Sequence, residues 1–202
     1  ERTLAQIVVN GKGSRRPPIA PDAFHAMLEA GVADGSIRFT NRGDVGVVAT
    51  IYERAFMGAM TAATRLFYEN CGWADEQAAT LAAALQYASD RNATAQLTFL
   101  NLDNNQISDE GVKALAAAAR AGAMAQLDAL TMENNRITDE GAKALADAGR
   151  AGAFPKLTSL NLRGSPSRTQ MRRMASSIFN PARAARAGRS GQAAYNPIAP
   201  SN

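Results

Sequence analysis

The chain has 202 residues, of which 46% are hydrophobic and 20% charged, and this is enough apolar material for one folded domain. Its single cysteine excludes an internal disulfide and favours a reducing compartment. We find no secretory signal pattern and no apolar run long enough to span a membrane, so the sequence does not predict a transmembrane protein.

The formal net charge of +4 is divided unevenly along the chain. The first 147 residues hold 13 basic and 18 acidic residues, whereas from residue 148 onward there are nine Lys or Arg and no Asp or Glu. An acidic body with a basic C-terminal tail predicts that the tail meets an acidic partner. That partner is a protein patch, a phosphate backbone or an anionic lipid surface.

The N-terminal part predicts an arm followed by helices. Residues 1–21 are rich in Gly, Pro and basic residues and predict an extended arm. Residues 22–63 predict a helical N-terminal cap over the units that follow. Its elements are a helix over 22–33 with Phe24, Met27 and Leu28 inward, a short strand at 36–39, and an amphipathic helix over 45–63 with Val45, Val48, Tyr52, Phe56 and Ala59 on one stripe.

The middle of the chain repeats itself with an offset of thirty residues. LTFLNLDNNQISDEGVKALAAAARAG occupies 97–122, and LDALTMENNRITDEGAKALADAGRAG occupies 127–152. A weaker copy starts at Leu66, with Cys71 in the place of Asn105, and another decays after Leu157. A period of this length predicts stacked units, none of which buries its apolar face alone.

These residues also carry a family resemblance. The pattern L-x-x-L-x-L-x-x-N-x-I at 97–107, and its counterpart at 127–137, resembles leucine-rich repeats, and the long helical second half resembles the ribonuclease-inhibitor-like subclass. The resemblance implies an α/β fold, a short curved solenoid over 64–165 with parallel strands on the concave face and helices on the convex face. Strands are then expected near 66–68, 98–102, 128–132 and 158–162, and helices over 75–88, 109–121, 139–151 and 169–178, the last within a C-terminal cap at 166–179.

Local chemistry agrees with this arrangement. Asn105 and Asn135 fall at the turn after each strand, where a buried amide can satisfy backbone groups that the curving chain leaves unpaired. Ser108 and Thr138 are suitable helix N-caps, and the acidic residues behind them complement the positive helix end.

The residues between the repeat leucines are the first candidate binding surface, because in such a solenoid they face outward on the concave side. One row of this face is acidic and ends at an arginine: Glu69, Asp103, Glu133 and Arg163. The alternative is a face that is merely solvated. The candidate partner-binding residues of the concave face are Phe67, Glu69, Phe99, Asn101, Asp103, Thr131, Glu133, Asn161 and Arg163.

The second candidate is the tail at 180–202, which has too few large apolar groups to fold alone. We expect it to be the principal docking element, on an acidic protein surface or on anionic lipid headgroups. Its prolines favour an extended backbone, which lowers the entropy lost on docking. The candidate residues in and before the tail are Arg172, Arg173, Phe179, Arg183, Arg186, Arg189, Tyr195 and Ile198.

Candidates for catalysis are few. The pairs Asp109-Glu110 and Asp139-Glu140 stand at helix starts, where capping explains them, and Cys71 has only His25 as a possible base. We find no metal-ligand cluster and no cofactor motif, so no catalytic, cofactor or metal residue is assigned and the chain is predicted not to be an enzyme. An enzyme using Cys71 or a carboxylate pair is the remaining alternative.

The sequence therefore predicts a non-catalytic interaction or scaffold subunit of a larger intracellular assembly. The absence of Met before Glu1 and the Ala- and Arg-rich ends favour a chloroplast or mitochondrion after removal of a transit peptide. The assembly is then expected to be an organellar membrane complex, such as a photosynthetic or respiratory one. The alternative is a ribonucleoprotein subunit whose C-terminal arginines contact RNA phosphates.

Overall fold

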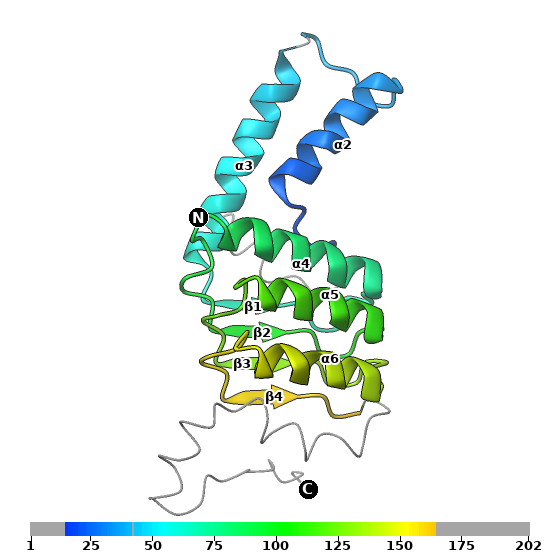
Figure 1. The fold of residues 1–202 in the computed structure, drawn as a ribbon. Coiled ribbons are helices and arrows are strands. Elements are labelled where there is room, and N and C mark those ends of the chain that lie inside the picture. Colours follow the sequence, from blue (N-terminus) through cyan, green and yellow to red (C-terminus); the bar gives the residue numbers. More distant parts are fainter. Residues whose placement is uncertain (1–14, 42, 165–202) are drawn as a thin grey trace, which may run out of the picture.

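The computed structural model describes residues 15–41 and 43–164. Two helices come first, and from residue 65 onward strands and helices alternate along the chain (Figure 1). The helices are α2 (Pro21–Ala33), α3 (Asp44–Ala62), α4 (Asp75–Ser89), α5 (Asp109–Arg120) and α6 (Asp139–Arg150), and the strands are β1 (Arg65–Phe67), β2 (Phe99–Asn101), β3 (Ala129–Thr131) and β4 (Ser159–Asn161).

The four strands form one parallel sheet in the order β1-β2-β3-β4. The helices α4, α5 and α6 stack in the same order in a second layer beside it (Figure 1). This confirms the expected α/β solenoid and the positions of its four strands and first three helices. The helix expected at 169–178 lies outside the described residues.

The core lies between the two layers and follows from the repeated apolar pattern. Leu100 on β2 and Leu115 on α5 are at most 1% exposed, as are Ile107 in the connection and Val112 at the start of the helix. Ala116, fully buried, presents only a methyl group, which lets neighbouring helices approach closely. Each unit thus contributes one layer of a core that continues into the next unit.

A buried asparagine joins each unit to the one before it. The Asn105 Oδ1 atom accepts hydrogen bonds from the backbone N–H groups of Cys71 and Trp73, at 3.1 and 3.0 Å. Its Nδ2 donates to the carbonyls of Tyr68 and Leu102, at 2.8 and 2.9 Å. The role expected from the sequence is therefore present, and it links backbone segments more than thirty residues apart in sequence.

Asn135 repeats this pattern one unit later, while the first unit does without it. The Asn135 Oδ1 accepts from the Ile107 N–H at 3.1 Å, and its Nδ2 donates to the Leu102 carbonyl at 2.9 Å. Cys71 occupies the equivalent place in the first unit, where no earlier unit needs such a link, and its Sγ lies 3.4 Å from the Glu69 carbonyl oxygen.

The first acidic residue of α4 and that of α5 each cap the start of the next helix. The Asp75 carboxylate accepts from Ser108 N, Ser108 Oγ and Gly111 N at 2.7, 2.6 and 3.0 Å. Asp109 does the same one unit later for Thr138 and Gly141. Sequence analysis assigned the capping to Ser108 itself, but its side chain makes no cap within its own helix.

The glycine of the Asp-Glu-Gly motif leaves space for this cap. A Cβ atom on Gly141 would stand 2.5 Å from the Asp109 Oδ1 and 3.0 Å from Ile137. The first unit has Gln77 instead, and there the Gln77 Oε1 accepts from the Ala74 N–H of its own helix start at 2.9 Å. The motif therefore differs where no preceding unit supplies the carboxylate.

The arm covers the open end of the first unit at Trp73. The Trp73 Nε1 donates to the Arg15 carbonyl at 2.5 Å, and the Tyr52 hydroxyl donates to the Ile19 carbonyl at 2.7 Å. Pro17 is buried in the same region. Residues 15–20 therefore fasten the N-terminal end of the solenoid to α3.

The helices α2 and α3 form a hairpin that projects beyond α4 (Figure 1). Its junction with the repeats is the C-terminal half of α3, where Phe56 and Met60 are buried and Phe56 meets Tyr87 edge to face at 5.9 Å. Two expectations were wrong here. Met27 points outward and is 46% exposed, because Phe24 and Leu28 already fill the contact with α3, and residues 36–39 form no strand because no neighbouring strand lies beside them to pair with.

Replacing Asn105 by Ala should lower the free energy of unfolding by about 1–3 kcal/mol, because buried backbone groups of two units lose their partners. Chemical denaturation followed by circular dichroism measures this. Gln106→Ala, at the exposed neighbouring position, is the control and should change the stability by less than about 0.5 kcal/mol. Equal effects of the two substitutions would contradict the proposed link between units.

Candidate functional site

The concave face shows the expected rows in register. Along the sheet, Arg65, Phe99, Ala129 and Ser159 are paired in sequence, and so are Phe67, Asn101, Thr131 and Asn161. The third row lies just beyond the strands, where successive backbone hydrogen bonds run from Asn70 to Asp103, from Asn104 to Glu133 and from Asn134 to Arg163. The structure thus brings the candidate residues of this face side by side, although Asn101 among them is buried.

One end of the face carries an aromatic pair beneath an arginine. The rings of Phe67 and Phe99 lie with centroids 5.3 Å apart, and both are partly exposed. The guanidinium of Arg65 lies over both rings, 5.1 Å from the first centroid and 4.5 Å from the second. Cation–π attraction holds this side chain across the strands and leaves an apolar surface with a positive rim.

Asparagines of the second row hold the carboxylates of the third. The Asn101 Nδ2 donates to Glu69 Oε2 at 2.7 Å, and the Asn161 Nδ2 donates to Glu133 Oε2 at 2.9 Å. The Asp103 Oδ1 accepts from the backbone N–H of Glu133 at 2.6 Å. The three carboxylates are therefore held in place along the edge of the concave face by neutral donors.

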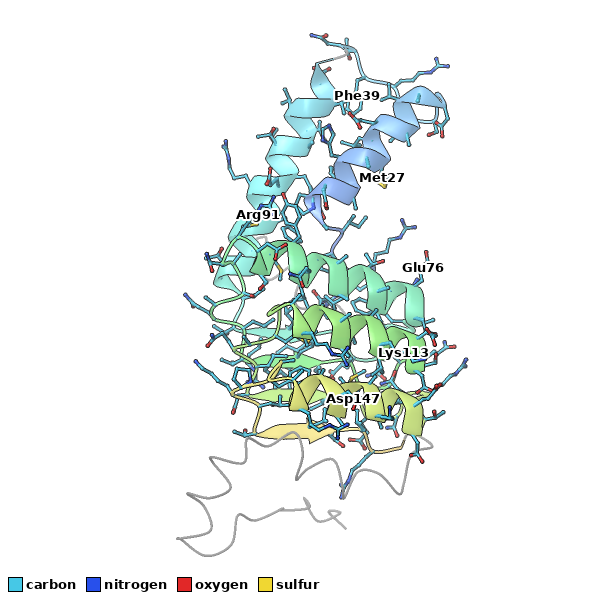
Figure 2. All side chains as sticks on the ribbon, viewed as in Figure 1. Met27, Phe39, Glu76, Arg91, Lys113 and Asp147 are labelled. Carbon is cyan, nitrogen blue, oxygen red and sulfur yellow. The ribbon has the colours of Figure 1, made fainter. Side chains whose placement is uncertain are left out.

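Among the described residues, no ion pair involves these three carboxylates. The ion pairs lie instead on the helices and the hairpin, such as Lys113 with Glu110 at 2.7 Å and Lys143 with Asp147 at 3.4 Å. Figure 2 shows Glu76, Lys113 and Asp147 on successive helices of that layer. Several charges of the helix layer are paired, whereas on the concave face three carboxylates share their row with one basic residue, Arg163.

The acidic row affects the titration of its central member. Burial raises the pKa of Asp103, and the charges of Glu133 and Glu69 raise it further, against the hydrogen bond from the Glu133 N–H. The cost of keeping this carboxylate charged falls when a cation approaches. The row is therefore electrostatically prepared for a basic group.

Cys71 does not have the surroundings of a nucleophile. Burial raises the pKa of the thiol, although the nearby Arg15 acts in the opposite direction, so the neutral thiol prevails at pH 7. His25, its only histidine candidate, lies on α2 and contacts Glu29, with Nε2 and Oε1 3.6 Å apart.

Asp109, the first member of one carboxylate pair, is occupied by its capping contacts. Burial alone would raise the pKa of Asp109, but the hydrogen bonds from Thr138 and Gly141 outweigh it and hold the pKa below its ordinary value. Asp75 behaves in the same way with Ser108 and Gly111. A carboxyl with a depressed pKa is a poor general base, so Asp109 and Asp75 are poorly suited to acid–base chemistry.

The remaining candidates fall outside the described chain. Arg172, Arg173, Phe179, Arg183, Arg186, Arg189, Tyr195 and Ile198 all lie beyond residue 164. Within residues 15–41 and 43–164, no cluster of three or more His, Cys, Asp or Glu side chains could hold a metal ion. In that same part of the chain no helix has the length and apolarity needed to cross a membrane.

Sequence analysis missed a second surface, on the hairpin. All the strongly exposed large hydrophobic side chains of the described residues lie there: Met27 at 46%, Val32 at 40%, Val47 at 58% and Ile51 at 61%. Figure 2 shows Met27 on α2 and Phe39 at the end of the hairpin farthest from the repeats. The signal was present in the run Val45–Val48, which is apolar on more than one side of a helix.

Comparison with known proteins bears on the repeats. The family model described as Leucine Rich repeat matches residues 96–116 and 127–146. These segments cover β2 with α5 and β3 with α6, the two units with the complete asparagine and Asp-Glu-Gly pattern. No curated protein matches the chain. The ribonuclease-inhibitor-like subclass stays a prediction.

Replacing Asp109 by Asn should destabilise the protein by about 1–3 kcal/mol at pH 7, because an amide offers one acceptor oxygen where three donors now meet a carboxylate. The folded pKa is depressed, so this stabilisation is present above about pH 4 and is lost as the pH falls through the folded pKa. Urea unfolding at pH 7, 5 and 3 should show that the difference in unfolding free energy between the parent protein and Asp109→Asn decreases as the pH falls. Glu110→Gln is the control. A difference that does not change with pH would contradict the capping role of the Asp109 carboxylate.

Native Cys71 should react slowly with a thiol reagent, and fast only after denaturation, because the buried group stays protonated. Labelling rates at pH 7 with and without guanidinium chloride test this. A native rate close to that of a free cysteine would revive the enzyme alternative.

Proposed function

We propose, since the chain is built of leucine-rich repeats, that it is a non-catalytic interaction subunit whose concave face binds a protein partner. Such repeats suggest a protein–protein interaction role. The observation that carries the proposal is the presence, on one face, of a partly exposed Phe67–Phe99 surface and of three carboxylates that form no ion pair with another described residue. A concave face that is merely solvated would require neither of these two features.

The partner's chemistry follows from the two parts of the face. An apolar or aromatic side chain fits against the two phenylalanine rings, where it gains stacking and buried area. Lysine or arginine side chains fit along Glu69, Asp103 and Glu133. The partner is therefore a protein segment that carries basic residues next to an apolar anchor.

A nucleic acid fits this face less well. Phosphate groups would meet the negative row, and like charges repel across a surface contact. The ribonucleoprotein alternative depends on arginines beyond residue 164, such as Arg172 and Arg183. The described face therefore favours a protein partner over RNA.

We place this subunit in a larger intracellular assembly, with an organellar membrane complex as one candidate. The exposed hairpin surface around Val47 and Ile51 supports an assembly role, because large apolar groups on a free surface mark contacts with other proteins. The concave face and the hairpin would then engage different neighbours.

Changing Phe67 and Phe99 to Ser should reduce retention of the native partner about tenfold or more, because both anchors of the face are lost. Tagged full-length variants, quantified by mass spectrometry of what they retain, measure this. Val47→Ser with Ile51→Ser tests the hairpin separately. Lys113→Ser with Lys143→Ser, on the helix layer, is the control.

Proteins lost only from the Phe67/Phe99 variant would be the concave-face partners. Equal losses from the control and the concave variant would contradict the proposal. Losses confined to the hairpin variant would move the binding site to α2 and α3. Circular dichroism of each variant excludes unfolding as the cause.

A further inference from the structure

The acidic row on the concave face leads directly to the start of the basic end of the chain. Arg163 is the last member of that row, and its carbonyl accepts from the Asn134 N–H one unit earlier. Beyond this point the sequence carries no acidic residue, and residues 180–202 contain Arg183, Arg186 and Arg189. The chain therefore carries a basic segment tethered beside three carboxylates that form no ion pair with another described residue.

The distances permit contact within one molecule. Neighbouring parallel strands are about 4.8 Å apart, so Glu69 lies roughly 14 Å from the end of the row at Arg163. Twenty residues separate Arg163 from Arg183. Even with the helix expected at 169–178, which would be about 15 Å long, the remaining ten residues add up to about 33 Å, so the chain is long enough to reach Glu69. Because the contact lies within one molecule, weak interactions suffice.

The order of residues also fits the order of the surface. A segment that leaves β4 and runs towards β1 passes Glu133 and Asp103 first and reaches Phe67 and Phe99 last. In the sequence the three arginines come first and Tyr195 follows them. Charges would meet carboxylates, and the aromatic ring would meet the aromatic pair.

We propose that residues 180–202 bind along the concave face of their own chain, with arginines on Glu69, Asp103 and Glu133 and Tyr195 at the Phe67–Phe99 pair, and compete there with the partner. This inference rests on the proposed function, because it assigns a competitor to the same face. A partner that binds the same face must then displace the tail.

A spin label on the tail of the full-length protein tests this docking. Ser190→Cys, in a Cys71→Ala background, carries the label beside Arg189, and paramagnetic broadening of backbone amide signals is measured at about 50 mM salt. We expect broadening of Asn101 and Thr131 on the concave face and little at Ala83 and Ala117, which are exposed on the helix layer. Broadening should fall severalfold at about 500 mM salt, because screening weakens exposed ion pairs.

Matched variants test the charge pairing. Glu69→Gln with Glu133→Gln keeps an acceptor oxygen for Asn101 and Asn161 and removes two charges, so the broadening should drop about fivefold. Glu76→Gln with Glu140→Gln removes the same amount of charge from the helix layer and should leave the broadening unchanged. Absent broadening in the parent protein, or an equal drop in both pairs of variants, overturns the proposal.

A mixed sample separates the same chain from a second copy. Isotope-labelled protein without a spin label is combined with unlabelled protein that carries one, and docking within one chain predicts no broadening. Broadening in this sample would overturn the proposal in favour of exchange between copies.

Partner retention keeps this test apart from that of the proposed function. Arg183→Gln, Arg186→Gln and Arg189→Gln together should raise retention about fivefold if the tail competes. If broadening is absent while the Phe67/Phe99 variant still loses its partner, only the proposal that the tail docks is refuted. If broadening is present but the Phe67/Phe99 variant retains its partner, only the proposal that the concave face binds the partner is refuted.

Discussion

Hydrogen bonds between consecutive units are the constraint on which the rest of this structure depends. A strand–helix unit of about thirty residues leaves backbone groups unpaired at its turn and at its helix start. Asn105 satisfies the first set in the preceding unit, and Asp75 satisfies the second set in the following one. Since each unit completes its neighbour, the units stack in one register, and that register aligns the concave rows.

The alignment explains why charges accumulate on one face only. On the helix layer, side chains three or four residues apart pair within a helix, as Lys113 and Glu110 do. On the concave face, neighbours come from different units, and the stacking superimposes Glu69, Asp103 and Glu133. Neutral asparagines orient two of these carboxylates without cancelling their charge. Repetition thus builds a charged surface that no single unit contains.

The two ends of the solenoid meet different needs. At the N-terminal end, the backbone of Arg15 covers Trp73, and Gln77 caps its own helix start. The hairpin beyond α4 is attached through the end of α3 and leaves Val47 and Ile51 exposed. Because the short arm closes this end of the solenoid, the hairpin is free to contact another protein. The chain therefore has two separate candidate surfaces, the concave face and the hairpin.

The sequence alone determined the repeat, its strands and helices, and the buried role of Asn105, because self-similarity and apolar periodicity are local signals. It also predicted the row formed by Glu69, Asp103, Glu133 and Arg163. Only the tertiary structure decided that Asp75 and Asp109 cap the next unit's helix, that Gly141 must lack a Cβ, and that Arg65 lies over Phe67 and Phe99. It also turned Met27 outward. These contacts join residues from neighbouring units or helices, so they depend on the stacking register and helix orientation, which no single stretch of sequence encodes.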